Sequence, residues 1–214
     1  MLQIIPAILS TSESDYKQKL LKIESNRTLS SGWIQIDFMD NKFVQNKSID
    51  CNIVKKYPTN LKIEAQLMVE YPESWIDELV RLDVARIIFP LELTSGITER
   101  IRHVKDHNKQ VGLSVNPETA IENLTPFLST IDSVLVMSVR PGFGGQQFIP
   151  ESFDKVRSLR SLSNRLKIGV DGGVNESVIK QLADAGADYV VIGSHLLEGE
   201  IDDNLNKLKK ALED

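Results

Sequence analysis

The stretch LKIGVDGGVNESVIKQLADAGADYVVIGSHLL, residues 166–197, contains two apolar runs separated by a pattern typical of a helix. The runs Leu166–Asp171 and Tyr189–Gly193 are short and rich in Ile and Val. Such runs are typical of strands covered on both faces in a parallel sheet. The helical pattern between them ends at Gly186, a residue suited to the left-handed backbone that follows many helices. The stretch therefore predicts a strand, a helix and a second strand.

The same alternation of strand and helix patterns continues through the rest of the chain. Ser12 is expected to cap the first helix, and Asn175 or Ser177 is expected to cap the helix that ends at Gly186. The other predicted strands are Gln3–Leu9, Trp33–Phe38, Leu61–Val69, Ala85–Phe89, Gln110–Val115 and Ser133–Val139. The helical patterns span residues 12–25, 71–82, 96–107, 150–162, 175–186 and 200–212.

About eight strand–helix cycles in 214 residues predict an α/β fold, the (β/α)8 TIM barrel, as a single domain over residues 1–214. The alternative is an open, doubly wound sheet. That fold calls for a glycine-rich turn after the first strand, and the sequence ILSTSES at residues 8–14 contains no glycine. The barrel is therefore the predicted architecture.

The composition is that of an ordinary globular protein, with 41% hydrophobic residues, 26% charged residues and a formal net charge of −5. No basic stripe indicates a nucleic-acid partner, and no polybasic segment indicates binding to a membrane. The apolar start MLQIIPAIL lacks a charged leader and is too short to span a bilayer. The single cysteine, Cys51, fits a reducing compartment, so a cytoplasmic location is expected.

Two polar side chains fall on one face of the second predicted strand. Ile34 and Ile36 share one parity, whereas Gln35 and Asp37 share the other. In a (β/α)8 barrel one parity faces the helices and the other faces the lumen, and active sites form at the carboxyl ends of the strands. Gln35 and Asp37 are therefore expected near a site in the lumen. The alternative is a buried polar pair without a function.

Glycine-rich segments follow three consecutive predicted strands. They are VRPGFGGQQF at residues 139–148, VDGGV at 170–174 and VIGSHLL at 191–197. Backbone N–H groups in such loops can approach an anion closely, and phosphate binds at the last strands of many barrels. A single glycine pair is also explained by turn chemistry. Three clusters together predict a phosphorylated small molecule as the ligand.

Several motifs together resemble the ribulose-phosphate 3-epimerase family over nearly the whole chain and in the same order. They are PAILS, DFMDNKFV, QLMV, NPET, MSVRPGFGGQQF, VDGGV and GADYVVIGS. The resemblance implies a (β/α)8 barrel that interconverts D-ribulose 5-phosphate and D-xylulose 5-phosphate. Its ligand would be a phosphorylated sugar, and a divalent metal would hold the substrate oxygens. It also implies a homo-oligomer.

The resemblance assigns roles by position. Asp37 and Asp171 match the two acid/base carboxylates, which are also metal ligands in the family. The residues that match substrate contacts are Met39, Met68 and Met137 beside the reacting carbon, and Gly142, Phe143, Gly144, Gly145, Gly172, Gly173, Gly193 and Ser194 on the phosphate side.

The departures from the family pattern concentrate in this site. Gln35 and Gln66 stand where the family has metal-binding histidines. A neutral carboxamide is a weak ligand for zinc, so a metal held by Asp37 and Asp171 is expected to be weak or absent. The two amides can instead bind the substrate by donating N–H bonds to an enediolate oxygen. The other departures are Ala7 for serine, Asn41 for glycine, Pro90 for histidine and Arg140 for asparagine.

Two other functions remain open from the sequence: a related barrel enzyme for another phosphosugar, and a phosphosugar-binding protein without catalysis. The Asp37 and Asp171 pair favours an enzyme, whereas the missing histidines favour the alternatives. His103 and His107 have the spacing of a metal pair, but a solvated helix face is predicted for them. His195 is expected to flank the site.

Overall fold

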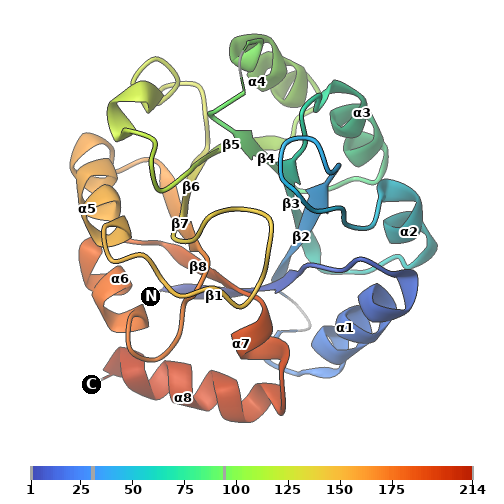
Figure 1. Cartoon of the computed structure of the whole chain (residues 1–214), viewed down its shortest axis with the longest axis vertical. Coiled ribbons are helices and arrows are strands. Elements are labelled where there is room, and N and C mark those ends of the chain that lie inside the picture. The colour runs from blue at the N-terminus through green and yellow to red at the C-terminus, as the bar shows by residue number, and fades with distance from the viewer. Residues whose placement is uncertain (1, 30–31, 94, 214) are drawn as a thin grey trace.

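The computed structural model describes residues 2–29, 32–93 and 95–213. Eight parallel strands close into a barrel in chain order, with helices around the outside (Figure 1), as the sequence predicts. The strands are β1 Gln3–Ile8, β2 Trp33–Met39, β3 Lys62–Met68, β4 Arg86–Pro90, β5 Gln110–Val115, β6 Ser133–Met137, β7 Lys167–Asp171 and β8 Tyr189–Ile192.

The outer helices follow the strands, except after β5, where a single 3-10 turn, η1 Ile121–Leu124, replaces a helix. The helices are α1 Glu13–Ser25, α2 Cys51–Lys56, α3 Glu73–Arg81, α4 Ile97–Asp106, α5 Ser152–Leu162, α6 Ile179–Ala185, α7 Ser194–Leu197 and α8 Ile201–Glu213. None of the helices within the described ranges is long and apolar enough to cross a membrane.

One of the two predicted helix caps is confirmed and the other is wrong. Ser12 caps α1, with its side chain accepting a hydrogen bond from the backbone of Asp15 at 3.3 Å. The helix α6, however, begins only at Ile179, and its N-cap residue is Val178. The Asn175 side chain instead accepts hydrogen bonds from the N–H and hydroxyl of Ser177, which closes a turn before the helix. Asn and Ser commonly form such local turns, so the pattern does not distinguish a turn from a cap.

The apolar core lies between the barrel and its helices. Ile34, Ile36 and Phe38 of β2 are fully buried in it, and the Phe38 ring lies 5.7 Å from the ring of Trp75 on α3. This places the apolar parity of β2 outward, against the helices. The polar parity therefore faces the lumen, as predicted.

A buried ion pair lies near the amino ends of the strands inside the lumen. Arg86 donates to Glu64 at 2.6 Å, and the Tyr189 hydroxyl lies 3.3 Å from the same carboxylate. The Arg86 guanidinium also lies 4.6 Å from the centre of the Trp33 ring. Gly169 leaves the space that Tyr189 needs, because a Cβ there would lie 2.2 Å from the Tyr189 ring. These side chains fill the lumen at the amino ends of the strands, on the opposite side from the carboxyl ends.

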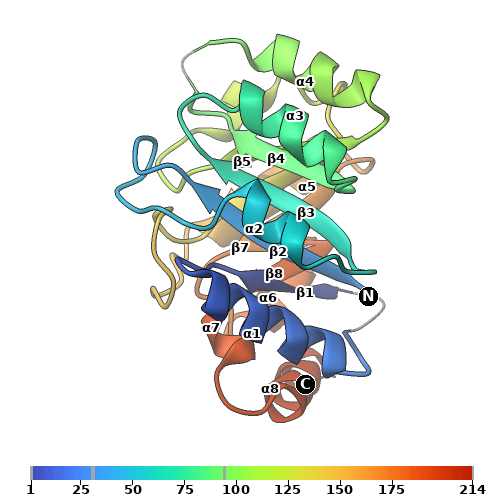
Figure 2. The same cartoon turned by 90° about the vertical axis from the view of Figure 1, so that its right-hand side faces the viewer.

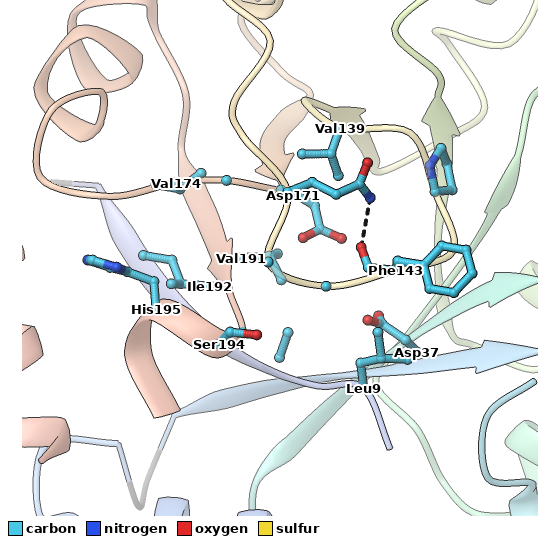
Figure 3. A pocket seen from close by; sticks show the side chains of 18 of the residues that line it. Leu9, Asp37, Val139, Phe143, Asp171, Val174, Val191, Ile192, Ser194 and His195 are labelled. Atoms are coloured by element: carbon cyan, nitrogen blue, oxygen red, sulfur yellow. Dashed lines mark hydrogen bonds between the residues drawn. The ribbon is translucent and has the colours of Figure 1, made fainter. Parts of the chain in front are cut away.

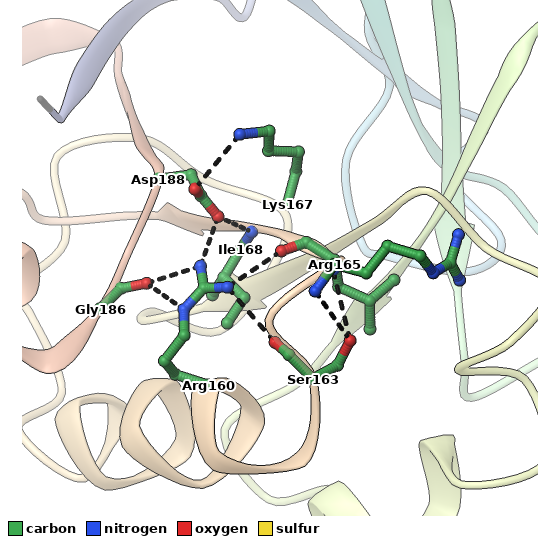
Figure 4. A network of polar contacts seen from close by, with 8 residues as sticks. Arg160, Ser163, Arg165, Lys167, Ile168, Gly186 and Asp188 are labelled. Atoms are coloured by element: carbon green, nitrogen blue, oxygen red, sulfur yellow. Dashed lines mark hydrogen bonds and ion pairs between the residues drawn. The ribbon is translucent and has the colours of Figure 1, made fainter.

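A polar network joins α5, β7 and the turn before β8 on the outside of the barrel (Figure 4). The Asp188 carboxylate accepts hydrogen bonds from Arg160 at 2.5 Å and from the backbone of Ile168 at 2.8 Å. Arg160 also donates to the carbonyl of Gly186, the left-handed residue that ends α6. The network fixes the amino ends of β7 and β8 and leaves their carboxyl ends free for other contacts.

The loops after β2 and β6 project from one end of the barrel, and β1 begins at the other (Figure 2). The projecting end is the carboxyl end of the strands. The isolated bridge between Asp40 and Lys47 orders the loop after β2. In this loop Asn41 has a left-handed φ of 60°. Asn tolerates that conformation better than most residues other than glycine.

Candidate active site

A cavity of about 720 Å³ opens at the carboxyl ends of the strands (Figure 3). The Asp37 and Asp171 carboxylates point into it, and Ser194 and His195 lie at its other end. It is lined by all the predicted site residues except the two glutamines: Asp37, Met39, Met68, Met137, Gly142, Phe143, Gly144, Gly145, Asp171, Gly172, Gly173, Gly193 and Ser194. The fold thus brings together side chains from β2, β3, β6, β7 and β8, and their roles stay predictions.

Gln35 and Gln66 do not line the cavity and are fully buried next to the two carboxylates. The Gln35 amide nitrogen lies 2.8 Å from Asp37 Oδ1, 3.1 Å from Asp171 Oδ2 and 2.7 Å from Gln66 Oε1. One amide therefore joins both carboxylates and the second amide. Because an NH2 group has only two protons, it cannot fully satisfy three oxygens.

The two amides can exchange roles. Rotating the Gln66 amide by half a turn puts its nitrogen 3.1 Å from Asp37 Oδ1 and 2.9 Å from Asp171 Oδ2. The Gln35 amide must then rotate as well, which puts its oxygen 2.7 Å from the Gln66 nitrogen. The same oxygen then lies 2.8 Å from Asp37 Oδ1 and 3.1 Å from Asp171 Oδ2, so this arrangement requires protonated carboxyl groups. In either arrangement an amide NH2 group lies between the carboxylates. The pair thus holds a hydrogen-bond donor at the centre of the site.

Burial raises the pKa of both carboxyl groups. The pKa of Asp37 lies well above its ordinary value because of burial and the nearby charge of Asp171, and the Gln35 hydrogen bond opposes this rise. Burial likewise raises the pKa of Asp171 to about 7, against the hydrogen bond from Gln35. The Glu64 charge beneath them raises both values further. Near neutral pH the pair therefore favours holding a proton.

The loop after β7 can be built only with glycine. Gly172 and Gly173 have φ values of 115° and 63°, in the left-handed region. A Cβ on Gly172 would lie 2.4 Å from the Val139 side chain, and one on Gly173 would lie 2.5 Å from the backbone nitrogen of Phe148. The β7 loop thus packs directly against the loop after β6. The two loops form one continuous wall of the cavity.

Lys19 and Asn175 are two of the polar residues in the cavity wall that the sequence did not assign to the site. The Lys19 ammonium, from α1, donates to the Leu9 carbonyl and to the Asp15 carboxylate, each at 2.7 Å. Asn175, beside the β7 loop, is the second. No sequence signal marked Lys19, because Lys and Asp four residues apart on a helix usually form a solvated pair.

His195 also lines the cavity, as expected, and its Nε2 lies 2.9 Å from a Glu176 oxygen. The other two histidines lie on the outer helix α4. Their rings are 5.1 Å apart, and His103 pairs with Asp77. Within the described part of the chain, no three His, Cys, Asp or Glu side chains are arranged to hold a metal ion.

A family model described as "Ribulose-phosphate 3 epimerase family" matches residues 3–197 of this chain. The chain belongs to the ribulose-phosphate 3-epimerase family. It is 32% identical to the cytoplasmic isoform of ribulose-phosphate 3-epimerase from Oryza sativa subsp. japonica, over 99% of this chain and 94% of the relative. It is 35% identical to ribulose-phosphate 3-epimerase from Schizosaccharomyces pombe, over 84% of this chain and 82% of the relative.

Solved structures with more distant sequences share the fold. A 3-keto-L-gulonate-6-phosphate decarboxylase from Vibrio cholerae superimposes with a TM-score of 0.73 at 12% identity, covering 99% of this chain and 97% of that one. A 3-hexulose-6-phosphate synthase superimposes with a TM-score of 0.70 at 15% identity, covering 99% of this chain and 100% of that one. These likenesses show the barrel alone.

The divalent metal that the epimerase family implies does not fit the four central side chains. An amide NH2 group lies between Asp37 and Asp171 in either arrangement. A cation at this position would face those N–H protons. With the amide oxygens turned inward, the donor set would be two carboxylates and two neutral amides without an imidazole or thiolate, which is a weak set for zinc. The side chains therefore form a hydrogen-bonded group in place of a metal site.

The other positions where the sequence is expected to depart from the epimerase pattern lie in different places. Ala7 lines the cavity, whereas Pro90 is buried and does not line it. Arg140 also lies outside this cavity and pairs with Glu118 at 2.8 Å. Ala7 therefore forms part of the cavity wall directly. The Arg140 pair lies on the surface at the start of the loop after β6.

Proposed function

We propose that the protein interconverts D-ribulose 5-phosphate and D-xylulose 5-phosphate, using Asp37 and Asp171 as the acid and base. The observation that carries the proposal is that both carboxylates enter one cavity from β2 and β7 and share hydrogen bonds with one buried amide. Membership in the epimerase family supports the same reaction. The substrate is therefore a ketopentose phosphate.

The reaction moves two protons at the carbon next to the carbonyl. One carboxylate removes the C3 proton from one face, and the electron pair of the C–H bond moves to form an enediolate with the carbonyl oxygen. The other, protonated carboxyl group then returns a proton to C3 from the opposite face. Raised pKa values suit this exchange, because one group must be protonated while the other is ionised at neutral pH.

The amides of Gln35 and Gln66 stabilise the charge on the enediolate. In either rotation one of them directs N–H groups toward the reacting carboxylates from below. When a substrate enters, such an N–H can move to the developing oxygen anion. Removing one donor of this kind from an enzyme costs about 2.7–4 kcal/mol in the transition state. The amide pair thus supplies electrostatic stabilisation without a metal.

The phosphate group binds at the other end of the cavity, among the glycine loops. Gly144, Gly172, Gly173 and Gly193 line this part together with the Ser194 hydroxyl. Around Gly193 the nearest atoms to an added Cβ, those of Ala7, lie 3.8 Å away, so the wall there remains open for a ligand. The loops support this proposal because their glycines line the cavity, and the backbone N–H groups of glycine loops can approach an anion closely.

A coupled assay with D-ribulose 5-phosphate tests the function. The protein is first treated with a chelator and then assayed alone and with Zn²⁺, Mn²⁺ or Fe²⁺. We expect epimerisation that persists after chelation and changes little when a metal is added. Stoichiometric zinc or iron in the purified protein, whose removal abolishes turnover, would refute the metal-independent reaction. No turnover under any of the four conditions would refute the epimerase function itself.

The variant Gln35→His/Gln66→His provides a matched comparison. Imidazole is a good ligand for zinc, so two histidines beside two carboxylates are expected to raise metal affinity by more than tenfold. Zinc affinity measured by titration is the readout, and it does not depend on activity. Equal zinc affinity in the variant and the original protein would contradict the role assigned to the amides.

A further inference from the structure

Lys19 is unusual because it lies on an outer helix but reaches the active-site cavity. Its ammonium group donates to the Leu9 carbonyl and to Asp15 at 2.7 Å each. Leu9 lies directly after β1, at the carboxyl end of the barrel, and lines the same cavity. The two hydrogen bonds hold the ammonium in place. The Lys19 side chain is 31% exposed, less than the 43% of Asp15, so solvent screens the carboxylate more than the ammonium.

Leu9, whose carbonyl binds this ammonium, lies near both ends of the cavity. On one side, the pairing of Ile8 with Ile36 puts Leu9 level with Asp37, one residue further along each strand. On the other side, a Cβ added to Gly144 would lie 3.9 Å from Leu9 and 3.4 Å from the Ser194 hydroxyl. Leu9 therefore adjoins both the acid/base pair and the glycine loops.

Lys19 also brings a positive charge to a cavity that otherwise contains several carboxyl groups. Among the described residues that line the cavity, it is the sole lysine or arginine, whereas Asp37, Asp171 and Glu198 carry carboxyl groups. An ammonium has three N–H donors, and the two hydrogen bonds above use two of them. The third donor remains for a ligand.

We propose that Lys19 binds the substrate by donating its third N–H to the sugar hydroxyl between the reacting carbon and the phosphate. This inference rests on the proposed function, since it needs a phosphorylated ketose in the cavity. The contact lies between the carboxylates and the phosphate loops, where the chain of the sugar must pass. Lys19 thereby helps to distinguish a sugar phosphate from inorganic phosphate.

The variants Lys19→Met and Lys19→Arg test the inference, with Lys22→Met as the matched control. Lys22 lies on the same helix and is likewise tied to backbone carbonyls, those of Leu197 and Gly199, but it does not line the cavity. Calorimetric titration measures the binding of two ligands: inorganic phosphate and a pentitol 5-phosphate, which has no carbonyl and does not react. Circular dichroism checks that each variant is folded.

We expect Lys19→Met to weaken binding of the pentitol phosphate by about 10- to 100-fold, as for the loss of a hydrogen bond to a charged group. Binding of inorganic phosphate should weaken by no more than about threefold, the range of a screened charge at a distance. Lys19→Arg should restore part of the affinity, and Lys22→Met should bind both ligands normally. In the epimerase assay, KM should rise while kcat changes little.

Unchanged binding of the pentitol phosphate by Lys19→Met would overturn the inference, and so would an equal loss for both ligands. An equal loss would show that Lys19 acts on structure or on charge in general. Turnover of D-ribulose 5-phosphate by the original protein is measured separately. If the original protein turns over D-ribulose 5-phosphate but Lys19→Met binds the pentitol phosphate normally, the proposed function stands and only the role of Lys19 is refuted.

Discussion

At the scale of single residues, the central feature of the molecule is an amide placed between two carboxylates. Gln35 joins Asp37 and Asp171 through hydrogen bonds of 2.8 and 3.1 Å. Parity and strand-end position predicted that both carboxylates face the lumen, because side chains alternate along a strand. The hydrogen bonds that join them were beyond prediction, because they depend on where two strands far apart in sequence meet.

Replacing either acid should stop catalysis without unfolding the protein. Asp37→Asn and Asp171→Asn each remove a proton carrier, so kcat should fall by about 10²- to 10⁴-fold. The kcat of the double variant should be about equal to that of the less active single variant, because the pair acts as a unit. Asp154→Asn, on an exposed part of α5, is the control. Normal kcat in either single variant would show that the geometry does not serve this reaction.

The raised pKa of Asp171 predicts how stability depends on pH. The folded-state pKa is about 7, whereas the unfolded value is about 3.9. The folded state therefore holds the proton more tightly, and the stabilisation from this group is complete below about pH 3.9 and is lost as pH rises through about 7. Asn mimics the protonated form at every pH.

Asp171→Asn should therefore gain stability relative to the original protein as pH rises from 5 to 8, by roughly 2 kcal/mol. Urea unfolding at both pH values measures the difference. Asp154→Asn, with its exposed side chain, should show no such trend. A difference that shrinks as pH rises would mean that the pKa of Asp171 is lowered rather than raised by folding.

At the scale of elements, the strands were predicted closely and the shortest helices were not. The predicted strand Gln110–Val115 matches β5 residue for residue. In contrast, α2 and α7 have six and four residues, fewer than two turns, so their sequences show no helical period. The 3-10 turn η1 is equally short. Tertiary contacts, rather than local pattern, decide such elements.

The loop after β7 gives a prediction at the same scale. Gly173→Ala would place a Cβ 2.5 Å from the Phe148 nitrogen in a left-handed conformation. The β6 and β7 loops must then separate, so phosphate affinity should fall by at least tenfold while circular dichroism stays unchanged. Gly199→Ala is the matched control, because its φ is 71° but no atom lies within 4 Å of its Cβ. Equal phosphate affinity in both variants would contradict the packing argument.

At the scale of the whole molecule, the lumen has two polar layers with different roles. The lower layer contains the buried pair of Glu64 and Arg86, which fills the barrel near the amino ends of its strands. The upper layer contains the amides and carboxylates of the site. Contacts at the amino end are expected to support stability, and those at the carboxyl end to support function.

Arg86→Met should destabilise the whole barrel, because it leaves the fully buried Glu64 without its partner. Breaking a buried pair in this way costs about 3–5 kcal/mol. Glu64→Gln/Arg86→Met should recover much of this loss, since neither remaining side chain is charged. Arg157→Met breaks an exposed pair with Asp154 and should cost at most about 1 kcal/mol. Urea unfolding compares all three, and a cost near zero for Arg86→Met would show that Glu64 is neutral when folded.

The sequence by itself determined the barrel, the inward parity of Asp37, and the glycine loops at the ends of β6, β7 and β8. These features follow from local rules, namely the period of apolar residues and the backbone freedom of glycine. Only the tertiary structure decided that Gln35 meets Asp171, 136 residues away, and that Lys19 reaches the cavity from an outer helix. The physical reason is that barrel closure and side-chain packing set the distances between remote residues, and no local pattern encodes them.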